Sequence, residues 1–226
     1  MRIQRDYTRY AGGSVLMEMG DTRVICTAMV QNRVPRHCLD QNIGWLSAEY
    51  CMLPGANPDR RSLRNYPDGR SQEIQRLIGR VLRSTVDLNQ FKGKTIWIDC
   101  NVIQADGGTR TASISGAFVA LVDALVQMRE DEVFETLPLV RGVAALSAGV
   151  VDNQVVVDLS AEEDRAAAVD MNVVMTHDGR FVEIQGTAEK QPFDTAQHEA
   201  MLELARLGIE KVKECQQEAL GDRLQL

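Results

Sequence analysis

Residues 96–113 carry the side chains whose types and spacing best fit a chemical task. They predict a strand with alternating apolar residues, then the pair Gly107 and Gly108, and then the first turn of a helix. A helix begins with free backbone N–H groups and the positive end of its dipole, and here Thr109 and Arg110 add a hydroxyl and a guanidinium. This combination favours a bound anion, most simply phosphate. The alternative is an ordinary strand-to-helix turn with surface Thr and Arg side chains.

A second candidate site lies in an acidic segment between residues 162 and 170. It contains four carboxylates: Glu162, Glu163, Asp164 and Asp170. Mg²⁺ takes oxygen ligands, so this segment is suited to holding Mg²⁺ or to supplying a general acid. A solvated acidic loop is the alternative. The histidines show no Ser-His-Asp or Cys-His arrangement and receive no role: His37, His177 and His198.

Arginines are concentrated in an irregular segment over residues 55–70. Its Pro, Asn, Asp and Gly residues predict a loop, and its arginines are Arg60, Arg61, Arg64 and Arg70. Guanidinium groups bind phosphates through paired hydrogen bonds and stack on bases, so single-stranded RNA or DNA is a candidate ligand. A solvated loop held by Asp59 and Asp68 is the alternative.

Length, charge and cysteine content limit the domain organisation, the mode of nucleic-acid binding and the cellular compartment. With 226 residues and 44% hydrophobic content, the chain can bury a sizeable core as one domain or as two packed halves. A net charge of −7 excludes a protein that coats polyanions generally, so nucleic acid must be held by a local basic patch. The five cysteines are scattered, without a CxxC pair, and we expect Cys26 and Cys100 to be core thiols in a reducing compartment. We find no signal peptide or membrane span and expect a cytoplasmic protein.

Turn residues divide the chain into elements that must position these side chains. Three hairpins are predicted, with turns at 20–21, 152–153 and 177–179. Further strands are predicted over 43–52 and 96–103, and helices over about 71–88, from the double-glycine turn at 107–108 onward, and over 195–220. This order predicts one α+β layered domain over residues 1–226, with two similar βα halves as a possible arrangement and a frayed end at 221–226.

Six blocks, in order along nearly the whole chain, resemble the ribonuclease PH family of phosphate-dependent 3′-to-5′ exoribonucleases. They are Gly13–Leu16 with Gly20–Thr22, Ala48–Tyr50 with Met52–Pro54, Glu73–Ile78, Gln104–Ser113, Asp170–Met175 and Gln185–Glu189. The resemblance implies an α+β fold of the ribonuclease PH type (ribosomal protein S5 domain 2-like), shared with polynucleotide phosphorylase and exosome ring subunits. It also implies a homo-hexameric ring built as a trimer of dimers.

The resemblance further implies a role for each candidate residue. Inorganic phosphate, the co-substrate, would be bound by Arg70, Gly108, Thr109 and Arg110. Asp164 and Asp170 match the two aspartates that the family associates with Mg²⁺ and with acid–base catalysis. Transfer RNA precursors would be bound by Arg60, Arg61 and Arg64. The implied reaction is attack of phosphate on the 3′-terminal linkage, which releases a nucleoside diphosphate and is reversible as nucleotidyl transfer.

A catalytically weak or inactive RNA-binding ring subunit, as found among exosome paralogues, is the alternative function. Two differences from the family pattern bear on RNA affinity and ring assembly. The chain has few residues before the first expected strand, and the arginine-rich loop is shorter, with Tyr66-Pro67-Asp68 leading into Arg70. The joint presence of the arginines and aspartates named above favours the active enzyme.

Overall fold

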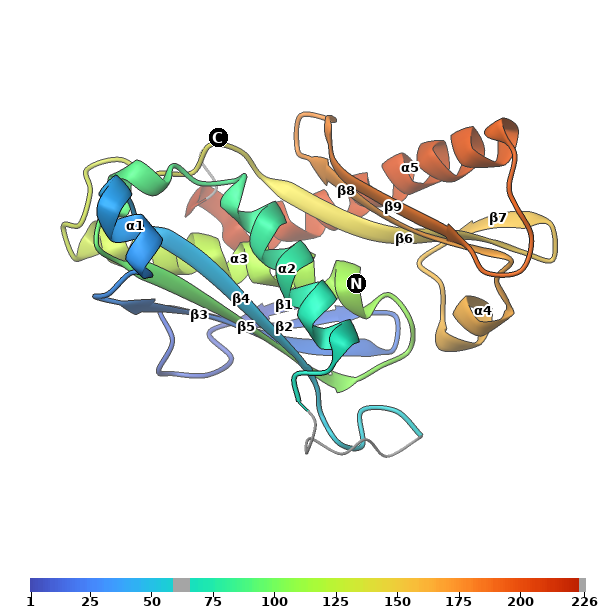
Figure 1. Cartoon of the computed structure of the whole chain (residues 1–226), viewed down its shortest axis with the longest axis horizontal. Coiled ribbons are helices and arrows are strands. Elements are labelled where there is room, and N and C mark those ends of the chain that lie inside the picture. The colour runs from blue at the N-terminus through green and yellow to red at the C-terminus, as the bar shows by residue number, and fades with distance from the viewer. Residues whose placement is uncertain (59–65, 224–226) are drawn as a thin grey trace.

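The hairpin around Gly20 belongs to a five-stranded sheet. The computed structural model describes residues 1–58 and 66–223 (Figure 1). The strands of this sheet are β1 (Arg2–Arg5), β2 (Gly13–Met19), β3 (Thr22–Gln31), β4 (Trp45–Met52) and β5 (Thr95–Gln104). Their order is β1-β2-β3-β5-β4, in which β4 runs parallel to β5 and the other neighbours are antiparallel. The predicted strands and hairpin of this half are confirmed.

A second, four-stranded sheet is entirely antiparallel. It consists of β6 (Val143–Val151), β7 (Gln154–Val157), β8 (Val169–Thr176) and β9 (Phe181–Ala188), in the order β7-β6-β8-β9. Asp152 and Asn153 both have positive φ angles, 49° and 62°, as the tight turn of a two-residue hairpin requires. Both hairpins predicted for the second half are confirmed.

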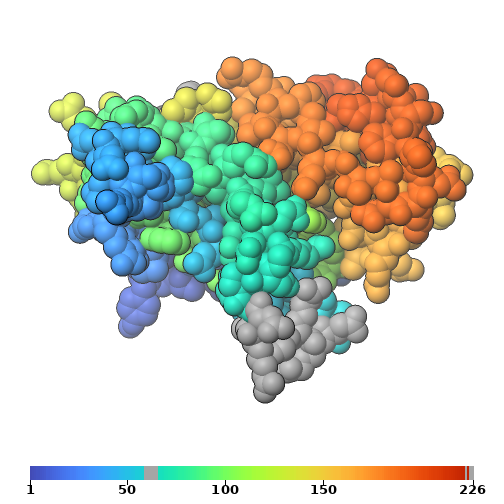
Figure 2. Space-filling view, viewed as in Figure 1, coloured from blue at the N-terminus to red at the C-terminus, as the bar shows by residue number. Residues whose placement is uncertain are grey.

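Helices pack beside and between the sheets. They are α1 (Arg36–Gln41), α2 (Gly69–Arg83), α3 (Thr109–Glu130), α4 (Ala161–Ala166) and α5 (Thr195–Leu220), with short 3₁₀ turns at Leu88–Phe91 and Gly221–Arg223. Helix α2 packs on β4, α5 packs on β6 and β7, and α3 contacts strands of both sheets. The surface of α2 meets the surface of the second sheet (Figure 2), where Arg80 forms an ion pair of 2.6 Å with Glu183 on β9.

Helix α3 is the centre of the core. By length and composition it is apolar enough to cross a membrane, a property that the sequence analysis overlooked, but 94% of its most apolar window is buried inside the protein. Glycines allow α3 and β2 to pack closely: a Cβ atom at Gly13 on β2 would lie 1.8 Å from the carbonyl oxygen of Ala120, and one at Gly116 on α3 would lie 2.8 Å from the Cβ atom of Met17. The expected core thiols Cys26 and Cys100 are both buried, free, and directly opposite each other on β3 and β5.

One predicted helix end was wrong, and the strand β1 and the helices α1 and α4 were not predicted. Helix α2 ends at Arg83 instead of near residue 88, because the Ser84 and Thr85 hydroxyls bond back to the preceding turn and Val86 leaves the helix to form a β-bridge with Leu139. Strand β1 was missed because its sequence Arg-Ile-Gln-Arg is polar and pairs only with β2. The short helices α1 and α4 lie in segments that were predicted as loops.

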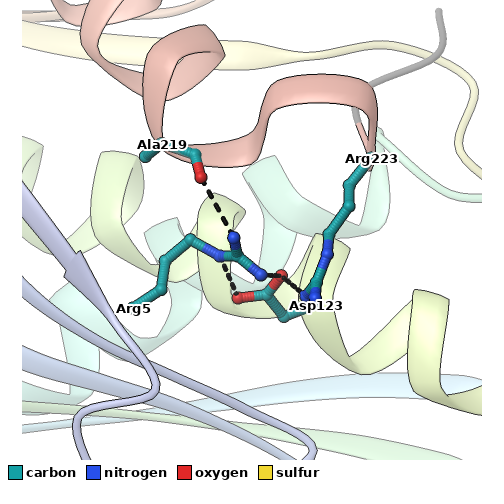
Figure 3. A network of polar contacts seen from close by, with 4 residues as sticks. All are labelled: Arg5, Asp123, Ala219 and Arg223. Atoms are coloured by element: carbon teal, nitrogen blue, oxygen red, sulfur yellow. Dashed lines mark hydrogen bonds and ion pairs between the residues drawn. The ribbon is translucent and has the colours of Figure 1, made fainter.

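A buried ion-pair network fastens β1 and the chain end after α5 to α3 (Figure 3). The Asp123 side chain is only 3% exposed. Arg5 donates from Nε and Nη2 to the two Asp123 oxygens at 2.8 and 2.7 Å, and from Nη1 to the Ala219 carbonyl at 3.1 Å. Arg223 adds a third bond to Asp123, at 2.9 Å. The hydrogen bonds to Asp123 raise the pKa of Arg5.

Candidate active site

A pocket of about 400 Å³ collects residues from both halves of the chain. Six of the nine predicted site residues line it: Arg70, Gly108, Thr109, Arg110, Asp164 and Asp170. They come from the starts of α2 and α3, from α4, and from the start of β8. The other three, Arg60, Arg61 and Arg64, lie outside the described residues. The structure thus brings together every predicted phosphate, metal and catalytic residue.

The double-glycine turn is required by close packing. Gly107 has a φ of +76°, and a Cβ atom there would lie 1.9 Å from the Leu159 carbonyl oxygen. The Thr22 hydroxyl holds the turn, since it donates to the Gly107 carbonyl at 2.6 Å and accepts from the Asp106 N–H at 2.8 Å. Gly108 is the N-cap of α3 and has no side chain that could occupy the free N–H groups of the first helical turn.

Replacing Gly107 with alanine is expected to lower the free energy of unfolding by about 2–4 kcal/mol, because strain at positive φ and a clash with backbone add together. Gly20→Ala is the matched control: Gly20 has a φ of +54°, but nothing lies within 4 Å of its Cβ position. Urea denaturation of both variants measures the difference. Equal losses would show that the contact with Leu159 does not constrain the turn.

Arg110 is held by a hydrogen-bonded chain across three elements. Its Nη2 donates to Glu73 Oε2 on α2 at 3.0 Å, and Glu73 Oε1 accepts from Gln185 Nε2 on β9 at 3.0 Å. The hydrogen bond from Gln185 and the charge of Arg110 hold the pKa of Glu73 below its usual value. Sequence reasoning did not select Glu73 or Gln185 as site residues, although both lie in blocks that match the family.

One donor of Arg110 has no partner. Its Nε is buried, and no acceptor within residues 1–58 and 66–223 bonds to it. A buried N–H group without an acceptor is costly, so such groups are normally satisfied by protein, water or a ligand. An anion in the adjoining pocket supplies oxygen acceptors, and this observation therefore fits phosphate.

Tyr50 positions the Thr109 hydroxyl. The Tyr50 phenol is 1% exposed and donates to Thr109 Oγ1 at 2.9 Å, while burial raises its pKa. Because Thr109 Oγ1 accepts this bond, its own proton is free for another acceptor. Tyr66 in turn donates to the Tyr50 carbonyl at 3.1 Å, which ties the chain before α2 to β4. The sequence analysis assigned no role to either tyrosine.

Arg70 approaches the pocket from the first turn of α2. The N-cap of this helix is Asp68, whose carboxylate accepts from the Ser71 N–H at 2.7 Å. The cap fixes where the helix begins and so places Arg70 on its second residue, exposed at the rim of the pocket. A guanidinium at this position adds positive charge opposite the two aspartates.

The two aspartates differ in environment. Asp164 is exposed on α4, whereas Asp170 is half-buried at the start of β8. Burial raises the pKa of Asp170, the Asp164 charge raises it further, and Arg110 and Arg70 oppose the rise. A capping box formed by Ser160 with Glu163 sets the start of α4.

The pocket offers a donor set that fits Mg²⁺. The described residues contain no cluster of three or more His, Cys, Asp or Glu side chains able to hold a metal. Mg²⁺ does not need one, since proteins commonly bind it through one or two carboxylates while water and substrate phosphates complete its shell. Asp164 and Asp170 line the same pocket and provide these carboxylates.

Sequence models of the two domains of the 3′ exoribonuclease family match residues 1–127 and 143–208. The matches cover more than half of the chain, and the chain belongs to the 3′ exoribonuclease family. Its fold is the predicted ribonuclease PH-like α+β fold, with two sheets and five helices in the part of the chain that the structure describes.

Solved structures share this fold at low sequence identity. Rice (Oryza sativa) Rrp46 is 15% identical with a TM-score of 0.78, over 96% of this chain and 93% of that chain. A chain of an Archaeoglobus fulgidus exosome with RNA bound to the active site is 24% identical with a TM-score of 0.81, over 94% and 86%. A chain of an archaeal exosome core is 21% identical with a TM-score of 0.77, over 96% and 85%.

Proposed function

We propose that this protein is a phosphate-dependent 3′-to-5′ exoribonuclease that trims the 3′ ends of transfer RNA precursors in the cytoplasm and releases nucleoside diphosphates. The observation that carries the proposal is the pocket in which the guanidiniums of Arg70 and Arg110, an uncapped helix N-terminus and the carboxylates of Asp164 and Asp170 converge from four elements. Membership of the 3′ exoribonuclease family supports exoribonuclease chemistry in general.

The phosphate nucleophile would lie against the start of α3. Arg110 and Arg70 would pair with its oxygens, and the Gly108 turn and the Thr109 hydroxyl would complete the site. Two cationic groups and a helix N-terminus offset the repulsion between this anion and the phosphodiester it attacks. Holding the two phosphates side by side turns an encounter in solution into a reaction within one complex.

The aspartates would act on the leaving group. A phosphate oxygen forms a bond to the phosphorus of the terminal linkage, the bond from phosphorus to the 3′-oxygen breaks, and that oxygen gains a proton. Asp164 and Asp170 would hold Mg²⁺, which when bound stabilises the charge developing on the phosphoryl oxygens and the leaving oxygen. Asp170 lines the pocket half-buried, and because burial and the charge of Asp164 raise its pKa, it is suited to hold or transfer that proton.

Recognition of the RNA body would fall to Arg60, Arg61 and Arg64, on the sequence grounds given above. The structural likeness to exosome chains, one of them in a complex with RNA bound to its active site, supports RNA as the ligand and a hexameric ring as the assembly. We propose a homo-hexamer, a trimer of dimers. The likeness to Rrp46 and to ring subunits also keeps a weakly active or inactive RNA-binding subunit as the competing proposal.

Product analysis tests the proposal directly. A 3′-tailed transfer RNA precursor is incubated with the protein and Mg²⁺, with and without inorganic phosphate. We expect nucleoside diphosphates only when phosphate is present. Monophosphates as products would contradict phosphorolysis. No product from protein that still binds the RNA would favour the inactive ring subunit.

Replacing Arg110 with glutamine is expected to raise the KM for phosphate by about 10- to 150-fold, the effect of losing charge-assisted hydrogen bonds of about 1.5–3 kcal/mol. Arg165→Gln is the matched control, because Arg165 lines the same pocket but its Nε donates to the Ala161 carbonyl at 2.9 Å. Steady-state rates at varied phosphate measure both variants. An equal rise in KM in both would mean that only the overall charge of the pocket matters.

A further inference from the structure

A second pocket lies at the other end of the four-stranded sheet. Its volume is about 480 Å³. It is formed by the segment just before β6, by the turn between β8 and β9, and by the C-terminal half of α5. Asp170 is the second residue of β8 and lines the candidate active site, and His177 directly follows β8 and lines the second pocket, so the two sites are separated by roughly 23 Å along the strand.

The side chains lining this pocket carry an excess of positive charge. Three cations from the three segments meet there, namely Arg141, Arg180 and Lys213, against a single lining carboxylate, that of Asp178. Asp178 is paired with Arg180 at 2.5 Å. Lys213 donates to the His177 carbonyl at 2.8 Å and forms an ion pair of 3.2 Å with Glu210, which lies outside the lining.

Arg141 is left without a partner. No hydrogen bond or ion pair reaches its guanidinium from any residue that the structure describes, and its Nε is buried. This matches the state of Arg110 Nε in the candidate active site. A partly buried guanidinium favours an anion that accepts from several of its N–H groups at once, and phosphate does so in a paired geometry.

His177, which lines the pocket, is held by a ring contact and by a hydrogen bond to a buried glutamine. The His177 ring lies edge-on to Phe118, with ring centres 5.4 Å apart, and its Nε2 hydrogen-bonds to Gln216 Oε1 at 2.9 Å. Gln216 is fully buried and donates to the carbonyls of Ser115 and Val143 at 3.0 and 3.1 Å. Burial lowers the pKa of His177 and so disfavours its charged form. The positive charge of the pocket therefore comes from the arginines and the lysine.

We propose that this pocket is a second anion site, which binds a phosphate group through Arg141 with Arg180 and Lys213 beside it. The phosphate can be free, as inorganic phosphate or the terminal group of a nucleotide, or part of an RNA chain. Pockets of this size accommodate a small organic ligand, and the exposed Val140 on the rim offers an apolar contact. The site is independent of the reaction proposed for the first pocket.

Equilibrium dialysis with radiolabelled inorganic phosphate tests the site. Arg110→Gln is introduced first, to weaken binding at the candidate active site, and the full chain is used throughout. We expect this variant to retain phosphate binding, and addition of Arg141→Gln to weaken it at least about tenfold. Arg206→Gln is the matched control, since Arg206 is an exposed α5 arginine paired with Glu203 away from the pocket.

Two further arms make the result decisive. Arg141→Lys keeps the charge but loses the paired N–H geometry, so it should bind phosphate more weakly than the parent and more tightly than Arg141→Gln, which separates the loss of the cation from a general loss of folding. Displacement of the label by an unlabelled nucleoside diphosphate or by a short single-stranded oligoribonucleotide identifies the source of the phosphate. The proposal is overturned if Arg110→Gln alone abolishes binding, or if Arg141→Gln leaves binding unchanged.

Discussion

Replacing Asp170 with asparagine is expected to lower the turnover number for phosphorolysis by about 10²- to 10⁴-fold, the usual contribution of a positioned acid or base. The amide keeps the size of the side chain but can neither transfer the proton nor offer an anionic ligand to Mg²⁺. RNA affinity should change little, because the arginines that would bind the RNA are untouched. Single-turnover rates at saturating phosphate, together with RNA binding measured separately, check both parts of the expectation.

Asp99→Asn is the matched control for this experiment. Asp99 also lies on a strand, and burial also raises its pKa, but it does not line the candidate active site. The control should retain turnover within a small factor. A fully active Asp170→Asn variant would refute the role proposed for Asp170, and a similar loss in both variants would point to a general structural effect.

The second large effect is expected on stability. Asp123→Ala should lower the free energy of unfolding by about 3–5 kcal/mol, because it leaves the largely buried Arg5 guanidinium without its carboxylate. Urea denaturation followed by circular dichroism measures the loss. Removing both charges with Arg5→Leu and Asp123→Leu should recover part of it, since an apolar pair avoids the unpaired charge.

Glu203→Ala provides the comparison with an exposed ion pair. Glu203 and Arg206 are one helical turn apart on α5 and both are solvated. Loss of their ion pair should therefore have little or no measurable effect on the free energy of unfolding. If Asp123→Ala were as mild, the network in Figure 3 would not hold β1 and the end of α5 to α3.

The elements that the sequence predicted well are those marked by turn residues or by regular apolar spacing within the segment itself. The hairpin at Asp152-Asn153 was predictable because both residues tolerate positive φ, and α5 was predicted with its observed bounds of Thr195–Leu220 because its apolar spacing continues over many turns. Strand β1 lacks such a signal, since a polar edge strand is recognisable only from its partner. Helix α4 did carry one, because Ser160 followed by Glu163 three residues later is a capping box.

The candidate site was predicted by residue type and by family resemblance, but its geometry was not. Local spacing places Gly108 and Arg110 at a helix start, but it does not reveal that α4 lies beside them, where the Ala161 N–H donates to Asp106 at 3.1 Å. The supporting residues Glu73 and Gln185 are 112 positions apart in sequence. Such contacts depend on how the two sheets pack around α3, and periodicity within one segment cannot reveal them.

The position of α3 between the sheets also has a consequence for how the protein is made. The ribosome completes this apolar helix before it makes β6, β8 and α5, the elements of the second half that cover it. At about 5–20 residues per second, synthesis through the end of α5 takes a further 5–20 s or so. Throughout that interval the face of α3 that packs on these later elements has no partner, so chaperone capture should peak on chains that end soon after Glu130 and fall once α5 has emerged.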